Sequence, residues 1–457
     1  MSRGSKKLPD RPKVDSARLA AYDVLVAVRQ DDAYANLVLP QLLRERAIGG
    51  RDAAFSTELV GGTLRGLASY DAVIDHLAGR SPDAAVRDAL RLGAHQLLGM
   101  RVPDHAAVTS TVELVRARVG HKPAGFTNAV MRKIAGRDLE AWMDTLGATQ
   151  AVRRSHPEWI VEALDRALAR PDELDALLAA DNERPRVTLV ARPGLSTVEE
   201  LTDSSAEVLH PSISPLAVTM DSGDPGAIAA VRDGRAGVQD AGSQLVALAL
   251  SRARVEGRDE RWLDLCAGPG GKAALLGALA TERGARLLAN ERQPHRAKLV
   301  AQAVRATVGD VVTGDGTRPP WLEATFDRVL VDAPCSGLGA LRRRPESRWR
   351  RTRADVVGLV PLQVALLLSA MDSVRFGGVV LYATCSPVVE ETVEVVEAML
   401  VKCRDTRLED ALSLVPEADD AESAHLRGAV QLWPHRHGTD AMFMALLRRT
   451  PVNWSSG

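Results

Sequence analysis

The chain has 457 residues, of which 46% are hydrophobic and 26% charged, and its formal net charge is −1. These values are ordinary for a globular protein and allow two or three domains with full cores. No uncharged apolar run reaches the roughly 18 residues that a membrane span needs, so we expect no membrane segment. Residues 1–13 lack the apolar core of a signal peptide and are interpreted as a basic, disordered tail.

Four cysteines lie at widely separated positions, namely Cys266, Cys335, Cys385 and Cys403. The absence of paired short spacings argues against a disulfide framework and against a zinc site. We therefore expect free thiols, no bound metal and a cytoplasmic location. We also expect a monomer, although no feature of the sequence reports the oligomeric state.

Residues 14–140 are predicted to form an all-helical domain. Leu19, Tyr22 and Val26 fall on one helical face, and Val86 and Leu90 begin another. Residues 1–140 hold 21 Lys+Arg and 16 Asp+Glu, a balance of +5, which leaves −6 for the rest of the chain. Such a weakly basic module is compatible with nucleic-acid binding.

Three stretches of this helical domain resemble the NusB-type RNA-binding domain. They are Arg87–Met100 (RDALRLGAHQLLGM), Arg101–Val108 (RVPDHAAV) and Gly125–Lys133 (GFTNAVMRK). That domain precedes the catalytic part of one group of bacterial ribosomal RNA methyltransferases. The resemblance implies that residues 14–140 bind RNA.

Residues 141–235 are predicted to be a connecting region of mixed structure. HPEWI at 156–160 starts a helix after a proline, residues 186–190 (RVTLV) form a short strand, and residues 211–224 are rich in turns. From residue 236 to residue 450 we expect a single larger domain.

Within that larger domain, apolar strands alternate with helical patterns. The predicted strands are 262–265, 286–290, 310–313, 328–331 and 378–383, with residues 441–447 as an added antiparallel strand. This alternation predicts an α/β domain with a Rossmann-like, doubly wound parallel sheet that binds ligands at the carboxyl ends of its strands.

The first of these strands leads into a glycine-rich turn, WLDLCAGPGGK at 262–272. The candidate cofactor-binding residues of the turn are Cys266, Ala267, Gly268, Pro269, Gly270, Gly271 and Lys272. Glu291 ends the second strand, where an acid suits ribose hydroxyls, and Asp315 follows the third, where it could reach an adenine edge. The pattern excludes a P-loop, but it suits NAD and S-adenosylmethionine equally.

The next two strands carry the side chains that indicate which reaction the site catalyses. VLVDAPCSGLG (329–339) places Asp332 and Cys335 at one strand end, and VVLYATCSP (379–387) places Cys385 at the end of the next. A thiolate that adds to carbon 6 of cytosine makes carbon 5 nucleophilic, and an acid near ring nitrogen 3 supports that addition. The residues alone do not tell which cysteine is the nucleophile.

Residues 342–353 (RRRPESRWRRTR) hold seven arginines among twelve residues. Arginine binds phosphate in a fork geometry, and tryptophan stacks on bases. We therefore predict an RNA-binding loop beside the target base, whose candidate residues are Arg342, Arg343, Arg344, Arg348 and Trp349.

Together, DLCAGPGGK, DAPCSGLG, RRRPESRW and YATCS closely resemble the motifs of the RNA 5-methylcytosine methyltransferases. The likeness is to the small-subunit (16S) ribosomal RNA group with a NusB-like domain, the Fmu/Sun or RsmB type. It implies a class I methyltransferase fold that uses S-adenosylmethionine. It also implies that Cys385 is the nucleophile, that Cys335 assists proton removal or product release, and that the turn, Glu291, Asp315 and Asp332 contact the cofactor.

Two other functions remain as alternatives. One is the same chemistry on transfer RNA, against which the NusB-like module counts. The other is an RNA-binding ribosome assembly factor with a vestigial site, against which the retention of Lys272, Asp332, Cys335 and Cys385 counts.

Overall fold

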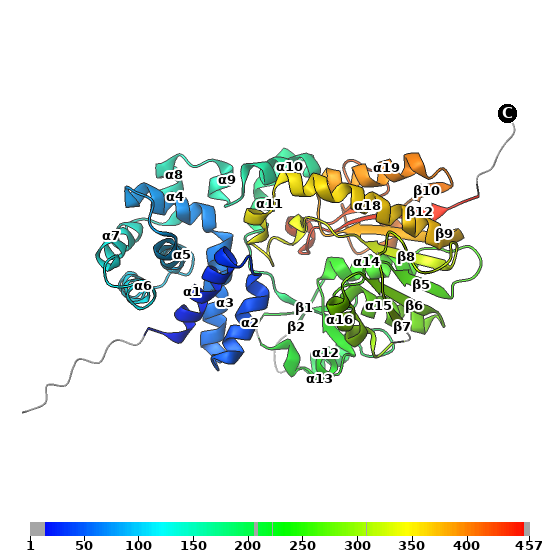
Figure 1. The fold of residues 1–457 in the computed structure, drawn as a ribbon, viewed down its shortest axis with the longest axis horizontal. Helices are drawn as coiled ribbons and strands as arrows, with labels where there is room; N and C mark the ends of the chain where they lie inside the picture. Colours follow the sequence, from blue (N-terminus) through cyan, green and yellow to red (C-terminus); the bar gives the residue numbers. More distant parts are fainter. Residues whose placement is uncertain (1–13, 205–208, 222, 308, 452–457) are drawn as a thin grey trace, which may run out of the picture. The chain divides into compact units, whose positions relative to one another are not determined.

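The computed structural model describes residues 14–204, 209–221, 223–307 and 309–451 (Figure 1). The chain divides into two compact units, neither of which is one continuous stretch. The first, here called the helical unit, comprises Met1–Glu158 and Arg343–Trp349. The second, the sheet unit, comprises Trp159–Arg342 and Arg350–Gly457.

The helical unit confirms the predicted all-helical N-terminal part. Its helices are α1 (Ser16–Gln30), α2 (Ala35–Glu45), α3 (Gly50–Arg65), α4 (Leu67–Ala78), α5 (Ala84–Leu98), α6 (Asp104–Arg118), α7 (Ala124–Ile134), α8 (Leu139–Leu146) and α9 (Gln150–Arg153). Tyr22, Val86 and Leu90, which the helical periodicity singled out, are buried in its core.

A small antiparallel sheet takes three strands from the predicted connecting region and its fourth strand from the residues directly after it. It consists of β1 (Val187–Ala191), β2 (Leu209–Pro211), β3 (Ala217–Met220) and β4 (Ala236–Val238) in the order β2-β3-β1-β4. Sequence reasoning predicted only the first of these strands. The helices in the same stretch of sequence are α10 (Glu158–Leu168), η1 (Pro171–Glu173), α11 (Leu174–Ala180), α12 (Val198–Ser204), η2 (Pro225–Ala227) and α13 (Ala229–Arg232), of which α12 and α13 contact the sheet.

The main sheet has the predicted parallel core. Its strands are β5 (Arg261–Asp264), β6 (Arg286–Glu291), β7 (Gly309–Thr313), β8 (Phe326–Asp332), β9 (Val374–Thr384), β10 (Thr406–Glu409), β11 (Val430–Gln431) and β12 (Phe443–Arg449). The order is β10-β12-β9-β8-β5-β6-β7, with β11 paired to β12. Strands β5 to β9 pair in parallel, and β12 joins β9 antiparallel, as predicted.

Helices cover both faces of this sheet (Figure 1). One face carries α14 (Ala241–Arg252), α15 (Gly271–Glu282) and α16 (Pro294–Val304), and the other carries α18 (Arg353–Ser373) and α19 (Val393–Lys402). The remaining short helices are η3 (Leu338–Ala340), α17 (Ser347–Arg350), η4 (Val389–Glu391), η5 (Leu412–Leu414) and α20 (Pro434–His437). Because both faces are covered, the central strands are continuous apolar runs, and the loops at their carboxyl ends hold the polar groups.

Among the described residues, α18 has the length and apolar composition of a membrane-crossing helix. In this protein α18 packs against β8, β9 and α19, and 44% of its most apolar window is buried. A core helix of a globular domain has the same composition, so this helix is weak evidence for a membrane span.

Candidate active site

The glycine-rich turn connects β5 to α15 and is tightly packed at Gly268 and Gly270. Gly270 has a φ of +110°, and a Cβ there would lie 2.7 Å from the Cβ of Ala303. A Cβ on Gly268 would lie 2.0 Å from Oε2 of Glu291. A side chain at either position would displace its neighbours, and the positive φ of Gly270 also favours glycine. The amides at the start of α15 suit a ligand with negative or electron-rich groups.

The structure brings Glu291 to this turn and Asp315 to the next loop of the same sheet edge. Glu291 is buried, and its Oε1 accepts the amide hydrogen of Gln293 at 2.8 Å. Arg296 lies 3.8 Å from the other carboxylate oxygen of Glu291 and donates to the Gly268 carbonyl at 2.6 Å. Asp315 is exposed, and hydrogen bonds from Thr317 lower the pKa of its carboxyl.

Two buried polar atoms near the turn have no hydrogen-bond partner within the described part of the chain. They are Oδ2 of Asp264, at the end of β5, and Oδ1 of Asn290, at the end of β6. Buried polar atoms are normally paired, so such orphans at strand ends indicate a place for a polar ligand. Sequence reasoning did not single out either residue, although their positions at parallel strand ends were a usable signal.

Lys272 and Asp332 form an ion pair beside the turn, with 3.0 Å between Nζ and Oδ2. Lys272 lies in the first turn of α15, and Asp332 ends β8. Burial lowers the pKa of Lys272, but the negative charges of Asp332 and Cys385 outweigh it, and the net pKa is raised. The lysine therefore stays positively charged in the site.

The two predicted catalytic cysteines lie together. Cys335 follows β8 and Cys385 follows β9, and these strands are parallel neighbours. Their Sγ atoms are 3.4 Å apart, and both side chains are partly exposed. The bond with Cys385 and burial raise the pKa of the Cys335 thiol. A reacting group beside the pair would be within reach of both sulfurs.

The predicted arginine loop is not one exposed surface, which differs from the sequence expectation. Arg342 is buried and bonds to the Gly438 carbonyl at 3.1 Å and to Asp440 at 3.3 Å. Arg348 is fully buried and donates to the Ser155 carbonyl at 2.9 Å. Both guanidinium groups therefore bond within the protein. The sequence did not predict this, because a run of charged residues does not show which side chains point inward.

Of the five predicted RNA-binding residues, Arg344 alone is exposed, and Arg343 and Trp349 are partly buried. The Arg344 guanidinium lies 5.7 Å from the centre of the Tyr34 ring in the helical unit. A contact of these three residues with RNA stays a prediction.

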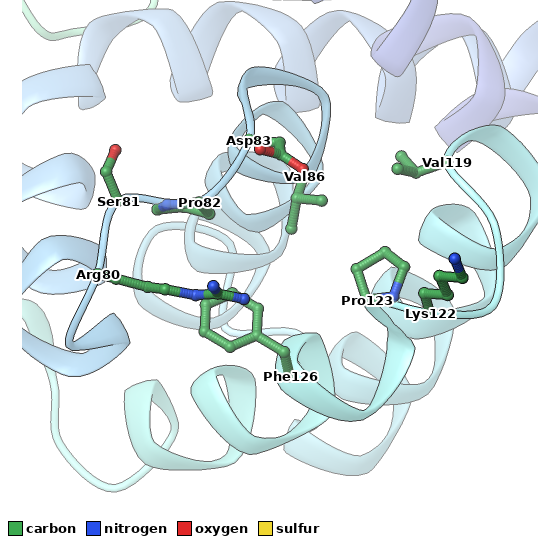
Figure 2. Close-up of a pocket in the computed structure, with 9 residues that line it drawn as sticks. All are labelled: Arg80, Ser81, Pro82, Asp83, Val86, Val119, Lys122, Pro123 and Phe126. Carbon is green, nitrogen blue, oxygen red and sulfur yellow. The ribbon is translucent and has the colours of Figure 1, made fainter.

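The helical unit contains a separate cavity of about 460 Å³ (Figure 2). Its lining comes from the loops that precede α5 and α7 and from the first turns of those helices, and it includes Arg80, Lys122 and Phe126. None of the predicted catalytic or cofactor residues lines it. Across the residues that the structure describes, no group of three or more His, Cys, Asp or Glu side chains is arranged to hold a metal ion.

Comparison with known families gives two matches along the chain. Residues 15–136 match the NusB family, and residues 254–448 match the family of the 16S rRNA methyltransferase RsmB/F. The second match contains the glycine-rich turn, the ion pair and both thiols.

Similar proteins extend the likeness to most of the chain. Rv1407 of Mycobacterium tuberculosis, which carries a provisional name as a methyltransferase, is 52% identical over 98% of this chain and 99% of its own length. The ribosomal RNA small subunit methyltransferase B of Citrobacter koseri is 33% identical over 85% of this chain and 91% of its own.

Among solved structures, that of PH0851 has a TM-score of 0.76 at 22% identity and covers 97% of this chain and 100% of its own. At that identity the likeness establishes the fold. Taken with the family matches and the full-length relatives, it leads to one conclusion: the chain belongs to the RsmB/F family of 16S rRNA methyltransferases.

Proposed function

We propose that this protein methylates carbon 5 of a specific cytosine in 16S ribosomal RNA, through a covalent bond between Cys385 and the base. The observation that carries the proposal is the pair of thiols 3.4 Å apart at the ends of β8 and β9, beside the Lys272–Asp332 ion pair. Methylation at a ring nitrogen or an oxygen has no use for two adjacent thiols, whereas attack at carbon 6 and release from it require sulfur chemistry.

S-adenosylmethionine is the cofactor that the residues around the glycine-rich turn fit. Gly268 and Gly270 leave space for close approach, Glu291 suits the ribose hydroxyls, and Asp315 suits an adenine edge. The orphan oxygens of Asp264 and Asn290 suit hydrogen-bond donors of the cofactor, such as its amino group. When bound, this cofactor supplies an electrophilic methyl group.

The side chains of the site carry out the remaining steps of the reaction. The Cys385 sulfur loses its proton and bonds to carbon 6 of the cytosine, while ring nitrogen 3 takes a proton, supported by Asp332. The electron pair that reaches carbon 5 makes that carbon the nucleophile that accepts the methyl group. Because a nearby cation stabilises a thiolate, the charged Lys272 suits Cys385 in this role.

Release restores the aromatic base. The proton on carbon 5 leaves, the carbon 5–carbon 6 double bond forms again, and the bond between carbon 6 and the Cys385 sulfur breaks. Ring nitrogen 3 gives back its proton in the same step. The 3.4 Å between the two sulfurs supports a role for Cys335 in proton removal or in departure of the Cys385 sulfur.

Mapping 5-methylcytosine in 16S RNA tests the proposal directly. Ribosomal RNA from cells with and without the protein is compared at nucleotide resolution, and purified protein is then added back with S-adenosylmethionine. One cytosine should lose its methyl group in the deletion and regain it in vitro. If the deletion leaves the methylation of ribosomal RNA unchanged but removes a methyl group from a cytosine in transfer RNA, the substrate is transfer RNA instead.

Substitution of each cysteine separates the roles of the two thiols. Cys385→Ala should lower methyl transfer by at least about 10³-fold while leaving cofactor affinity unchanged, because it removes the nucleophile. Cys335→Ala should instead accumulate a protein–RNA adduct that survives denaturing electrophoresis. Cys403→Ala is the matched control, since that cysteine bonds to Asp405 after α19 and outside the site. Turnover retained by Cys385→Ala would exclude it as the nucleophile.

A further inference from the structure

A buried carboxylate, Glu391, lies behind the two thiols and is not explained by cofactor binding or by chemistry on the base. Glu391 belongs to η4 and is fully buried. Within the described ranges it forms no ion pair, which is unusual because a buried charge normally needs a compensating partner. Its compensation comes entirely from hydrogen-bond donors around Cys335.

The carboxylate binds the residue that follows Cys335 through both of its oxygens. Oε1 accepts the backbone amide hydrogen of Ser336 at 2.7 Å, and Oε2 accepts the Ser336 hydroxyl at 2.5 Å. Charge-assisted bonds of this kind are about twice as strong as neutral ones. They fix the peptide on the carboxyl side of Cys335.

Gln363 of α18 fixes the peptide on the other side. Its Nε2 donates to the Pro334 carbonyl at 2.9 Å and to Oε1 of Glu391 at 3.2 Å. Tyr382 of β9 donates its hydroxyl to the backbone carbonyl of Glu391 at 2.7 Å. Cys335 is thus held between two anchored peptide groups, and the anchor itself is fixed to the sheet.

The same group of residues reaches the second cysteine. The Ser336 and Ser386 hydroxyl oxygens are 3.2 Å apart, and Ser386 directly follows Cys385. Ser336, Gln363, Ser386 and Glu391 are all buried, so these bonds lie in a low-dielectric environment, where they are strong and costly to break.

We propose that Glu391 is a positioning residue that sets the location of the Cys335 thiol relative to Cys385, and thereby the release of the methylated base. The effect on release rests on the proposed function. The positioning of Cys335 does not, because it can be measured in the protein without RNA or cofactor. Glu391 makes no bond to either sulfur in the structure, so it acts through the Pro334–Cys335–Ser336 backbone. Because Glu391 and Gln363 bond directly to that backbone and reach Cys385 through the Ser336–Ser386 contact, Cys335 should be the more sensitive thiol.

The first test measures thiol reactivity in the protein without RNA or cofactor. Iodoacetamide labelling followed by mass spectrometry gives separate rates for Cys335 and Cys385. Glu391→Ala should change the ratio of the two rates by about tenfold, since small displacements of a reacting group have large effects. Glu391→Gln keeps an acceptor for the Ser336 amide and should restore most of the wild-type ratio.

The matched control is Glu390→Gln, at the neighbouring carboxylate, which is partly exposed and pairs with Arg166 at 3.1 Å. Ser336→Ala keeps the Ser336 amide bond to Glu391 but removes the hydroxyl that bonds to Oε2 of Glu391 and to Ser386. It should give a smaller change than Glu391→Ala, and it provides the test where Glu391→Ala does not fold. An unchanged ratio in both Glu391→Ala and Ser336→Ala, or in Ser336→Ala when Glu391→Ala is unfolded, overturns the proposal.

The second test measures the catalytic consequence. Glu391→Ala should lower kcat about tenfold with little change in the KM for S-adenosylmethionine, and should accumulate the denaturant-resistant RNA adduct as Cys335→Ala does. A loss of turnover without adduct, alongside a normal adduct in Cys335→Ala, overturns the assignment to release. If wild-type protein methylates no cytosine and Cys335→Ala forms no adduct, the proposed function fails, and the labelling ratio still decides the positioning role.

Discussion

The buried carboxyl of Asp264 lies near the Lys272–Asp332 ion pair. Asp264 is fully buried, one of its oxygens has no partner in the described chain, and burial together with the nearby charge of Asp332 raises the pKa of its carboxyl to about 8. Lys272 remains charged beside Asp332. At neutral pH the site therefore balances one cation against one anion and keeps Asp264 largely protonated.

The free energy of unfolding should depend on pH because the Asp264 carboxyl holds its proton more tightly in the folded chain. The unfolded chain loses it near the ordinary pKa of 3.8, whereas the folded chain holds it up to about 8. The contribution of Asp264 to stability is therefore full below about pH 4 and is lost as the pH rises to about 8. Its slope reaches at most about 1.4 kcal/mol per pH unit.

Asp264→Asn removes this proton exchange and should flatten the decline in unfolding free energy between about pH 5 and about pH 7. Urea unfolding of the cofactor-free wild type and variant measures both slopes. The same slope in the two proteins would place the pKa of Asp264 near its ordinary value.

At the scale of elements, the start of α2 shows how a distant segment completes a helix. The N-cap residue, Tyr34, makes no side-chain cap bond. Instead, Oε1 of Glu346 accepts the Ala35 amide hydrogen at 3.0 Å, and both residues are buried within the helical unit. A carboxylate at a helix N-terminus satisfies an otherwise unpaired amide and favours the helix dipole.

Glu346→Ala should destabilise α2 locally by about 1–3 kcal/mol, the cost of a buried donor without a partner. Glu346→Gln retains an acceptor and should lose less. Hydrogen exchange of the amides in Ala35–Glu45 measures the effect, with Glu45→Ala, an exposed residue of the same helix, as the control. If the amides of Glu346→Ala exchanged at the wild-type rate, Glu346 would be excluded as a cap of α2.

The elements also show how far sequence reasoning extends. The parallel strands β5–β9 were predictable because long apolar runs end in polar or glycine-rich turns, and the neighbouring ends of β8 and β9 bring Cys335 and Cys385 together. Strands β2 to β4 are only three or four residues long, too short to show a period. Glu391 was missed because its main partners are a backbone amide and hydroxyl, which leave no pattern in the sequence.

At the scale of the whole molecule, RNA binding should depend on a few exposed arginines rather than on the total charge. The net charge is −1, so long-range attraction to RNA is weak and local contacts decide. Arg342 and Arg348 are engaged inside the protein, which leaves Arg344 as the exposed member of the predicted RNA-binding set.

Arg344→Ser should weaken RNA binding and reduce the slope of log K against log salt concentration by about 0.7–0.9, the value for one lost phosphate contact. Binding of 16S RNA fragments over a range of salt concentrations measures the slope. Arg286→Ser, at an exposed arginine outside this loop that pairs with Asp310 at 3.2 Å, is the matched control. Equal slopes for wild type and Arg344→Ser would exclude Arg344 from the RNA contact.

The insertion of Arg343–Trp349 into the helical unit has a consequence for synthesis on the ribosome. The N-terminal unit is not complete when its last N-terminal residue, Glu158, has been made, because about 190 further residues must follow before Trp349. At ordinary rates of translation that interval lasts on the order of ten to forty seconds. During it, the nascent helices lack the carboxylate that caps α2 and the arginine that binds the Ser155 carbonyl. The first 158 residues of the chain therefore cannot complete their fold until Arg343–Trp349 have been synthesised.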